Sequence, residues 1–180
     1  IQEKEEEYRR DEIKRQRKEQ FEKEQLLQAL NELKALSSEE SICRMKQESE
    51  MSPVWKYISK DFPFSWDELP DFLNLDVSNG DWIFGCDRRI WQIAFYKNFI
   101  LRKDKPFSIK IVDNFLQNAV GCNIPLSVKN VGRYSKRYPD LVPISIYSDL
   151  PGSWKTLREY FNYLSESGML EFSGDDYHNP

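Results

Sequence analysis

Residues 107–172 read FSIKIVDNFLQNAVGCNIPLSVKNVGRYSKRYPDLVPISIYSDLPGSWKTLREYFNYLSESGMLEF. The first part of this stretch predicts a helix that begins after Ser108, a good N-cap residue, and ends at Gly121. Its apolar residues recur every three or four positions, which is the period of one helix face. They are Ile109, Val112, Leu116 and Ala119.

Two more helices follow in the same stretch. The second opens at Pro125-Leu126-Ser127, and the third begins after Ser153, where Trp154, Leu157, Phe161 and Leu164 form an apolar stripe. We expect an extended segment over residues 141–147 and a strand over residues 169–172. Three helices and a closing strand in this order predict a winged-helix unit over residues 105–174. Winged helices bind nucleic acid or another protein and rarely catalyse a reaction.

Residues 1–36 predict a long charged helix. Neither Gly nor Pro interrupts it, and acid-base pairs recur at the favourable spacing of four residues. These pairs are Glu5 with Arg9, Glu6 with Arg10, Asp11 with Arg15, and Glu19 with Lys23. Leu26, Leu30 and Leu33 form an apolar stripe that is too short to establish a coiled coil. The stripe can pack on the protein itself or bind another subunit, and the basic side chains of this helix can also contact RNA.

The part of the chain between the arm and residue 105 predicts several short elements. Residues 37–52 suggest a new helix start, with Ser37 and Glu40 at capping-box spacing, followed by a linker. Within residues 53–104 we expect a β-hairpin over residues 73–86, because Asn79-Gly80 suits a two-residue turn; a tight loop between helices is the alternative. Residues 88–102 are apolar almost all round and predict a buried helix.

These predictions together give the fold class. It is mainly α with a small β component: a long charged N-terminal helix, then a compact helical domain with a β-hairpin and a C-terminal winged-helix unit. Residues 175–180 are expected to be a disordered tail. The tail contains His178, the one histidine of the chain, and a chain terminus is a poor place for a catalytic base.

Basic residues gather on the second and third helices of the winged-helix unit. Near the second helix they are Lys129, Arg133, Lys136 and Arg137, and at the start of the third they are Lys155 and Arg158. A basic helix end can contact phosphate, so these six residues are the candidate nucleic-acid-binding site. A merely solvated positive face and an acidic protein partner are the other two interpretations.

The same stretch resembles the LOTUS domain, also called OST-HTH. The resemblance rests on Pro125-Leu126-Ser127, Lys136-Arg137-Tyr138-Pro139-Asp140, and Ser153 with Leu157. It implies a winged helix of RNA-regulatory proteins in ribonucleoprotein granules, where some members bind a DEAD-box RNA helicase and others bind RNA directly. The loop departs from the family pattern, because residues 148–151 separate Tyr147 from Gly152.

Composition and motifs indicate which classes of function to exclude. No stretch is long and apolar enough to span a membrane, and no metal-ligand spacing or phosphate-binding glycine motif occurs. We therefore expect no enzyme, no cofactor, no metal and no small-molecule substrate. The three cysteines are odd in number and form no C-x-x-C pair, so we expect free thiols in a reducing compartment, the cytoplasm or the nucleus.

Two functions remain. The first is a non-catalytic module of an intracellular RNA-regulatory protein that binds RNA or an RNA helicase. The second is a structural subunit whose N-terminal helix docks on a larger complex, through Leu26, Leu30 and Leu33, and whose winged helix binds protein. The net charge of −4 favours the second function, because it argues against binding nucleic acid through bulk charge.

Overall fold

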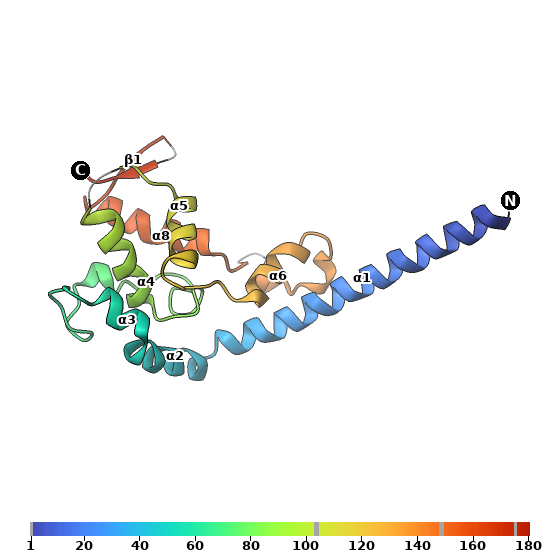
Figure 1. Cartoon of the computed structure of the whole chain (residues 1–180), viewed down its shortest axis with the longest axis horizontal. Coiled ribbons are helices and arrows are strands. Elements are labelled where there is room, and N and C mark those ends of the chain that lie inside the picture. The colour runs from blue at the N-terminus through green and yellow to red at the C-terminus, as the bar shows by residue number, and fades with distance from the viewer. Residues whose placement is uncertain (1, 103–104, 148–149, 175) are drawn as a thin grey trace. The chain divides into compact units, whose positions relative to one another are not determined.

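A computed structural model describes residues 2–102, 105–147, 150–174 and 176–180. The predicted segments also contain Ile1, Lys103, Asp104, Ser148, Asp149 and Asp175, which lie outside the described residues. The fold is mainly helical, with a long N-terminal helix and a small antiparallel sheet (Figure 1), so the predicted class of a mainly α protein with a small β component is confirmed.

The helices are α1 (Gln2–Leu36), α2 (Glu39–Met51), α3 (Pro53–Ile58), α4 (Arg88–Phe95), α5 (Ile109–Asn118), α6 (Leu126–Tyr134), α7 (Ile144–Tyr147) and α8 (Ser153–Glu166). Short 3-10 turns lie at η1 (Asp71–Leu73) and η3 (Pro139–Leu141), and a π-helical turn lies at η2 (Tyr96–Ile100). The strands are β1 (Glu171–Ser173) and β2 (Asp176–His178).

The chain divides into two compact units. Unit 1 consists of residues 1–34 and 126–150, and unit 2 consists of residues 35–125 and 151–180. The predicted winged-helix unit over residues 105–174 is therefore not one compact body, because α6 and α7 belong to unit 1 while α5 and α8 belong to unit 2. Sequence spacing located the three helices but carried no information about which of them share a core.

Unit 1 contains all but the last two residues of α1, which is 35 residues long. Its side chains as far as Phe21 are almost all exposed, and ion pairs along the helix, such as Glu6–Arg10 at 3.6 Å and Glu19–Lys23 at 2.6 Å, support it. Arg15 pairs with Glu12 rather than with the predicted Asp11.

The second half of α1 is buried on one side. Leu26, Leu30 and Leu33, which the sequence offered as a partner-binding stripe, are at most 9% exposed. In the same unit α6 buries Val128 and Val131. The leucine stripe is covered by the protein itself, so it is not a free docking surface. The physical reason for this burial is that apolar side chains gain free energy when the fold removes them from water.

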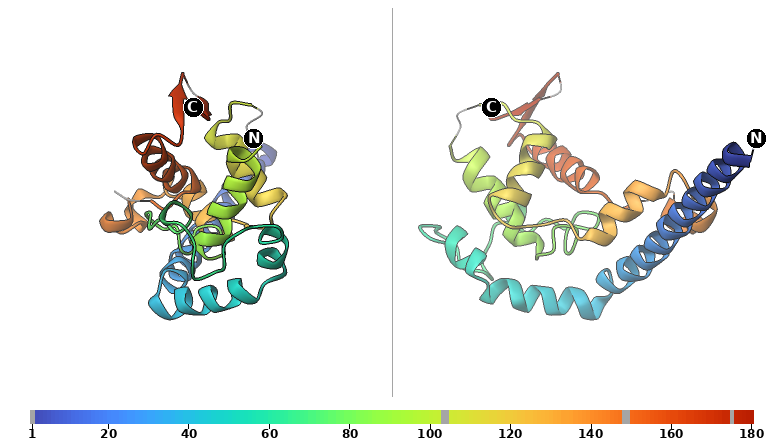
Figure 2. Two further views of the ribbon diagram at one scale, coloured as in Figure 1. Left: turned by 90° about the vertical axis from the view of Figure 1, so that its left-hand side faces the viewer. Right: turned by 45° about the vertical axis from the view of Figure 1, so that its right-hand side comes forward.

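Unit 2 has an aromatic core. The ring of Trp91 on α4 lies 5.1 Å from that of Tyr160 on α8, and Phe95 lies 4.9 Å from Phe161. Phe107, just before α5, packs edge-on against Phe95 at 5.5 Å. Helix α5 packs against α8, and α4 packs against α5. Their course can be followed by colour in Figure 2, from green (α4) through yellow (α5) to red (α8). The predicted buried helix over residues 88–102 is thus buried along α4 and continues as the π-helical turn η2.

The predicted hairpin over residues 73–86 does not form. Residues after η1 make consecutive turns, in which Gly80 donates to the carbonyl of Val77 and Ile83 donates to that of Asn79. The Gln92 side chain binds both the N–H and the C=O of Leu75, at 2.9 and 2.8 Å. A side chain of α4 therefore satisfies the N–H and C=O of Leu75, which a partner strand would bind in a hairpin. The alternative prediction of a tight loop between helices is confirmed.

Helix starts differ from prediction in detail. Ser38 rather than Ser37 caps α2, and its side chain accepts from the N–H of Ser41. Helix α2 then continues through the expected linker to Met51. Helix α8 begins at Ser153 itself, after Gly152, which provides no side-chain cap. Trp154, placed on the inner stripe by its spacing, is 48% exposed.

The segment over residues 141–147 was predicted to be extended. Val142 is extended, but a helical turn follows at α7, where Ile146 donates to the carbonyl of Pro143 at 2.9 Å. Proline suits the first turn of a helix, since its φ is already helical and no N–H is needed there. The prediction of continuous extended chain was therefore wrong.

The C-terminal residues form a strand rather than a tail. Strand β1 pairs with β2 in antiparallel register, with Phe172 opposite Tyr177. Tyr177 is buried, and its backbone exchanges two hydrogen bonds of 2.8 Å with Phe107. The predicted disordered tail over residues 175–180 is corrected accordingly, and the C-terminus completes the core of unit 2.

Candidate nucleic-acid interface

Three of the predicted cations form a stripe on α6 in unit 1. Lys129, Arg133 and Lys136 are spaced by four and three residues, so they share one side of the helix and the turn that follows it. All three are exposed, whereas Val128 and Val131 on the other side are buried. We call Lys129, Arg133 and Lys136 the α6 cation stripe.

The α6 cation stripe keeps its positive charge available. Within the described part of the chain none of its three side chains forms an ion pair with a carboxylate. The guanidinium of Arg133 lies 5.8 Å from the ring centroid of Tyr134, a contact that positions it without neutralising it. Exposed cations of this kind can bind phosphate with little desolvation.

Arg137 behaves differently, because Glu22 of α1 binds it. Its Nη1 atom donates to both carboxylate oxygens of Glu22, at 3.0 and 2.7 Å, and the hydroxyl of Tyr138 donates to Oε2 at 2.8 Å. Glu22 is only 6% exposed. We call Glu22, Arg137 and Tyr138 the Glu22 clamp. It pairs the charge of Arg137 with a carboxylate and joins two distant segments of unit 1.

The clamp shifts the pKa values of its members. Hydrogen bonding from Tyr138, followed by hydrogen bonding and charge from Arg137, lowers the pKa of Glu22 despite the opposing effect of burial. The hydrogen bond and charge of Glu22 raise the pKa of Arg137. Burial, and then the hydrogen bond to Glu22, raise the pKa of Tyr138. All three shifts favour the ionised Glu22, charged Arg137 and neutral Tyr138.

We predict that acid weakens the fold through Glu22. Because its folded pKa lies below its unfolded one, Glu22 stabilises the fold above the unfolded pKa, and this contribution is lost as pH falls through the folded pKa. Chemical denaturation between about pH 6 and about pH 3 should therefore show falling stability that Glu22→Gln makes flatter. The exposed Glu24→Gln on the same helix is the control. An equal flattening by Glu24→Gln would contradict the prediction.

The other two predicted cations, Lys155 and Arg158, lie on α8 in unit 2. The six residues therefore do not form one surface within either unit. Arg158 borders a hollow of about 480 Å³ with Asn162 and Ser165 of α8 and the aromatic residues Phe172 and Tyr177. The hydroxyl oxygen of Ser165 is buried and has no hydrogen-bond partner there.

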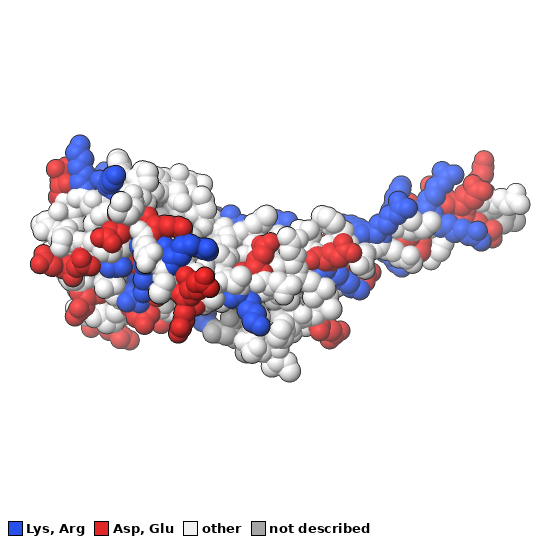
Figure 3. Space-filling model, turned by 90° about the horizontal axis from the view of Figure 1, so that it is seen from below, with Lys and Arg blue, Asp and Glu red and all other residues white. Residues whose placement is uncertain are grey.

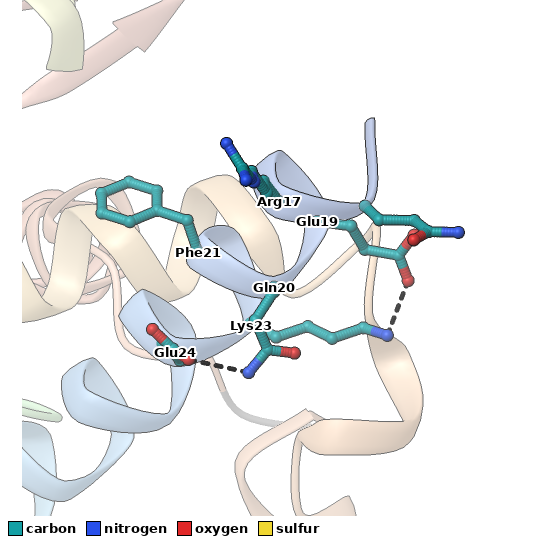
Figure 4. A pocket seen from close by; sticks show the side chains of 7 residues that line it. Arg17, Glu19, Gln20, Phe21, Lys23 and Glu24 are labelled. Carbon is teal, nitrogen blue, oxygen red and sulfur yellow. Dashed lines mark hydrogen bonds and ion pairs between the residues drawn. The ribbon is translucent and has the colours of Figure 1, made fainter. Parts of the chain in front are cut away.

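A further hollow lies on α1 and has no second element to close it. Its lining residues, which include Arg17, Phe21 and Lys23, all belong to this one helix (Figure 4). Lys23 is held by Glu19, and Gln20 donates to Glu24 at 2.7 Å, so these polar groups are already paired. On the face drawn in Figure 3, acidic and basic side chains alternate along the N-terminal part of α1. This part of the helix presents no net basic surface.

Among the described residues, no three or more His, Cys, Asp or Glu side chains gather in a way that could hold a metal ion. In the same ranges, no helix combines the length and apolar character that a bilayer crossing requires. His178 lies in β2, 3.8 Å from Glu171 across the sheet.

Comparison with family models, with curated proteins and with solved structures found no match for the chain. The geometry of the chain itself therefore carries the functional argument.

Proposed function

We propose that the protein is a non-catalytic helical module of an intracellular RNA-regulatory protein, and that it binds RNA through the α6 cation stripe. The observation that carries this proposal is the exposure of Lys129, Arg133 and Lys136 on one side of α6, without carboxylate partners in the described chain. The resemblance to LOTUS domains adds the expectation of RNA or a DEAD-box helicase as partner.

The phosphate backbone is the part of RNA that this surface suits. Lys and Arg side chains that neutralise phosphates release condensed counterions, which makes binding depend on salt. Three cations supply affinity without selecting a base sequence, because base selection requires contacts with base edges. We therefore expect weak binding to single strands of any sequence, with a salt dependence set by this stripe.

Replacing Lys129, Arg133 and Lys136 together with Ala should weaken binding to a fluorescent single-stranded RNA. The slope of log K against log salt should become less steep by about 2, since each lost phosphate contact contributes about 0.7. A matched control replaces three exposed cations of α1, Lys4, Arg9 and Lys18, with Ala. Its net charge therefore equals that of the α6 variant. Fluorescence anisotropy over a salt series gives both values.

Two results would refute the phosphate-binding role. One is an unchanged salt slope in the α6 variant, and the other is an equal change in the α1 control, which would indicate an effect of bulk charge alone. Arg137→Ala is left out of the variant, since it would break the Glu22 clamp and confuse binding with folding.

A second function has its own supporting observation. The first twenty residues of α1 are almost wholly exposed, including Tyr8 and Ile13, which are 73% and 49% exposed. Apolar side chains on an unpacked helix are the kind of surface that another subunit of a larger complex covers. In this alternative the protein is an assembly subunit that docks through the N-terminal part of α1.

Deletion of residues 1–20 separates the two functions. It leaves Glu22, Leu26, Leu30 and Leu33 in place, so unit 1 keeps its buried side. We expect the truncated chain to retain RNA binding and the far-UV circular dichroism contributed by its remaining helices. The full chain and the truncated chain are each used to recover a complex from nuclease-treated extract. If only the full chain recovers it and both chains bind RNA, residues 1–20 are an assembly element. If the truncated chain no longer binds RNA, the RNA site lies on α1 instead.

A further inference from the structure

Two cysteines that are distant in sequence meet in unit 2. The sulfur atoms of Cys86 and Cys122 lie 3.3 Å apart, although the residues are 36 positions apart in the chain. Neither belongs to a C-x-x-C pair, so sequence spacing gives no sign of the contact. The remaining cysteine, Cys43, is exposed on α2.

The backbone around the two cysteines is built for this contact. Each cysteine follows a glycine with positive φ, +66° at Gly85 and +74° at Gly121, a conformation that other residues rarely adopt. A Cβ atom placed on Gly85 would lie 3.0 Å from the carbonyl oxygen of Asn123. The two Gly-Cys turns therefore touch, and glycine at position 85 is what allows the close approach.

The environment of the thiols sets how they react. Cys86 is half-buried, so a small oxidant can reach it, whereas Cys122 is buried. The hydrogen bond to Cys122 and burial raise the pKa of Cys86 well above its ordinary value, and the negative charge of Asp87 adds to the effect. The raised pKa favours the thiol form of Cys86, whereas disulfide formation proceeds through the thiolate.

We propose that Cys86 and Cys122 are an oxidisable dithiol, a covalent modification site that closes to an intramolecular disulfide. With hydrogen peroxide, one thiol gives a sulfenic acid and water, and the second thiol then displaces the sulfenic oxygen as a second water. With a small disulfide such as oxidised glutathione, two exchange steps release two reduced glutathione molecules. In both routes the two cysteines lose two electrons and two protons to the named oxidant.

The disulfide would join the turn before α4 to the turn after α5. These helices pack against each other in the core of unit 2, so the bond would hold an existing contact rather than create a new one. A cross-link across a separation of 36 residues restricts the unfolded chain strongly. Oxidation should therefore raise the melting temperature of the protein by several degrees, and a reductant should reverse the rise.

The test uses the full chain with Cys43→Ser, which removes the exposed thiol. The reduced protein is incubated with hydrogen peroxide or oxidised glutathione, then denatured, alkylated with N-ethylmaleimide and weighed by mass spectrometry. We expect two alkylated cysteines before oxidation and none after it, with a mass lower by about 2 Da before alkylation. Peptide mapping should give a cross-linked peptide that contains Cys86 and Cys122.

Several outcomes would overturn the proposal. The first is that both cysteines remain alkylated after an oxidant dose that oxidises free dithiothreitol to its disulfide. The second is that the cysteines carry only glutathione or sulfinic acid. The third is that the disulfide joins two chains. A disulfide that lowers the melting temperature would also overturn it, because the bond would then distort the contact. Adding Cys86→Ser to the Cys43→Ser chain should leave Cys122 open to alkylation after oxidation. Circular dichroism checks that this double variant folds. The peptide mapping of the Cys43→Ser chain stands whether or not the double variant folds.

Discussion

Replacing Trp91 with Ala should lower the free energy of unfolding by about 3–5 kcal/mol. Trp91 is fully buried on α4, and its indole ring packs against Phe84 and Tyr160 at centroid distances of 5.3 and 5.1 Å. Its Nε1 atom also donates to the carbonyl of Gly80 at 2.9 Å. The substitution would open a cavity in the aromatic core and leave that buried carbonyl without its partner, and both effects destabilise.

Chemical denaturation followed by far-UV circular dichroism measures this loss, since α4 and its neighbours are helical. Trp154→Ala is the matched control, because Trp154 is 48% exposed, and it should change stability far less. Trp91→Phe should lie between the two, because it keeps most of the ring volume and loses the hydrogen bond. Equal losses at Trp91 and Trp154 would show that the aromatic core is not the main source of stability in unit 2.

The second large effect is expected at Asp87. Its carboxylate caps α4 by accepting from the N–H of Arg89 at 2.9 Å, and it pairs with the guanidinium of the same residue at 2.8 Å. Arg89 also lies 3.8 Å over the ring of Trp66. The two paired side chains are 1% and 15% exposed. Asp87→Ala would remove the cap and leave the half-buried guanidinium of Arg89 without its carboxylate partner, at a cost of about 3–5 kcal/mol.

Asp87→Asn separates the two contributions, because asparagine can still cap the helix but carries no charge. It should cost less than Asp87→Ala in the same denaturation experiment. Asp76→Ala is the control, since Asp76 pairs with Arg88 at 3.0 Å but is 82% exposed, and such pairs contribute at most about 1 kcal/mol. If Asp87→Ala behaved like Asp76→Ala, the buried ion pair would have no role in stability.

Local patterns predicted the helices of this chain well. Ser108 caps α5 as expected, because capping depends on a few adjacent residues, and Ser52-Pro53 starts α3 through the same local chemistry. The absence of Gly and Pro, together with acid-base pairs four residues apart, located α1, and the start at Pro125-Leu126-Ser127 located α6. By contrast, Asn79-Gly80 signalled a hairpin that does not form, since the Gln92 side chain on α4 competes for the backbone of Leu75. A contact across the chain thus overrode a local preference.

The candidate site was predictable only in part. The exposed positions of Lys129 and Arg133 follow from the helix period, but the pairing of Arg137 with Glu22 joins residues 115 positions apart. One signal was present: Glu22 precedes Leu26 by four residues and so lies on the apolar stripe of α1. An acidic residue on a stripe that becomes buried needs a partner. The stripe did not indicate which cation that partner would be.

The division of the chain has a consequence for its synthesis and dissection. Unit 2 is discontinuous, because residues 126–150 are inserted between Pro125 and Pro151, and its core needs Tyr160, Phe161 and Tyr177 from beyond the insertion. A nascent chain that has emerged only to residue 125 therefore exposes the aromatic side of α4 and α5, and a fragment cut there would tend to aggregate. To isolate unit 2, residue 125 must be joined to residue 151 by a linker that replaces the insertion.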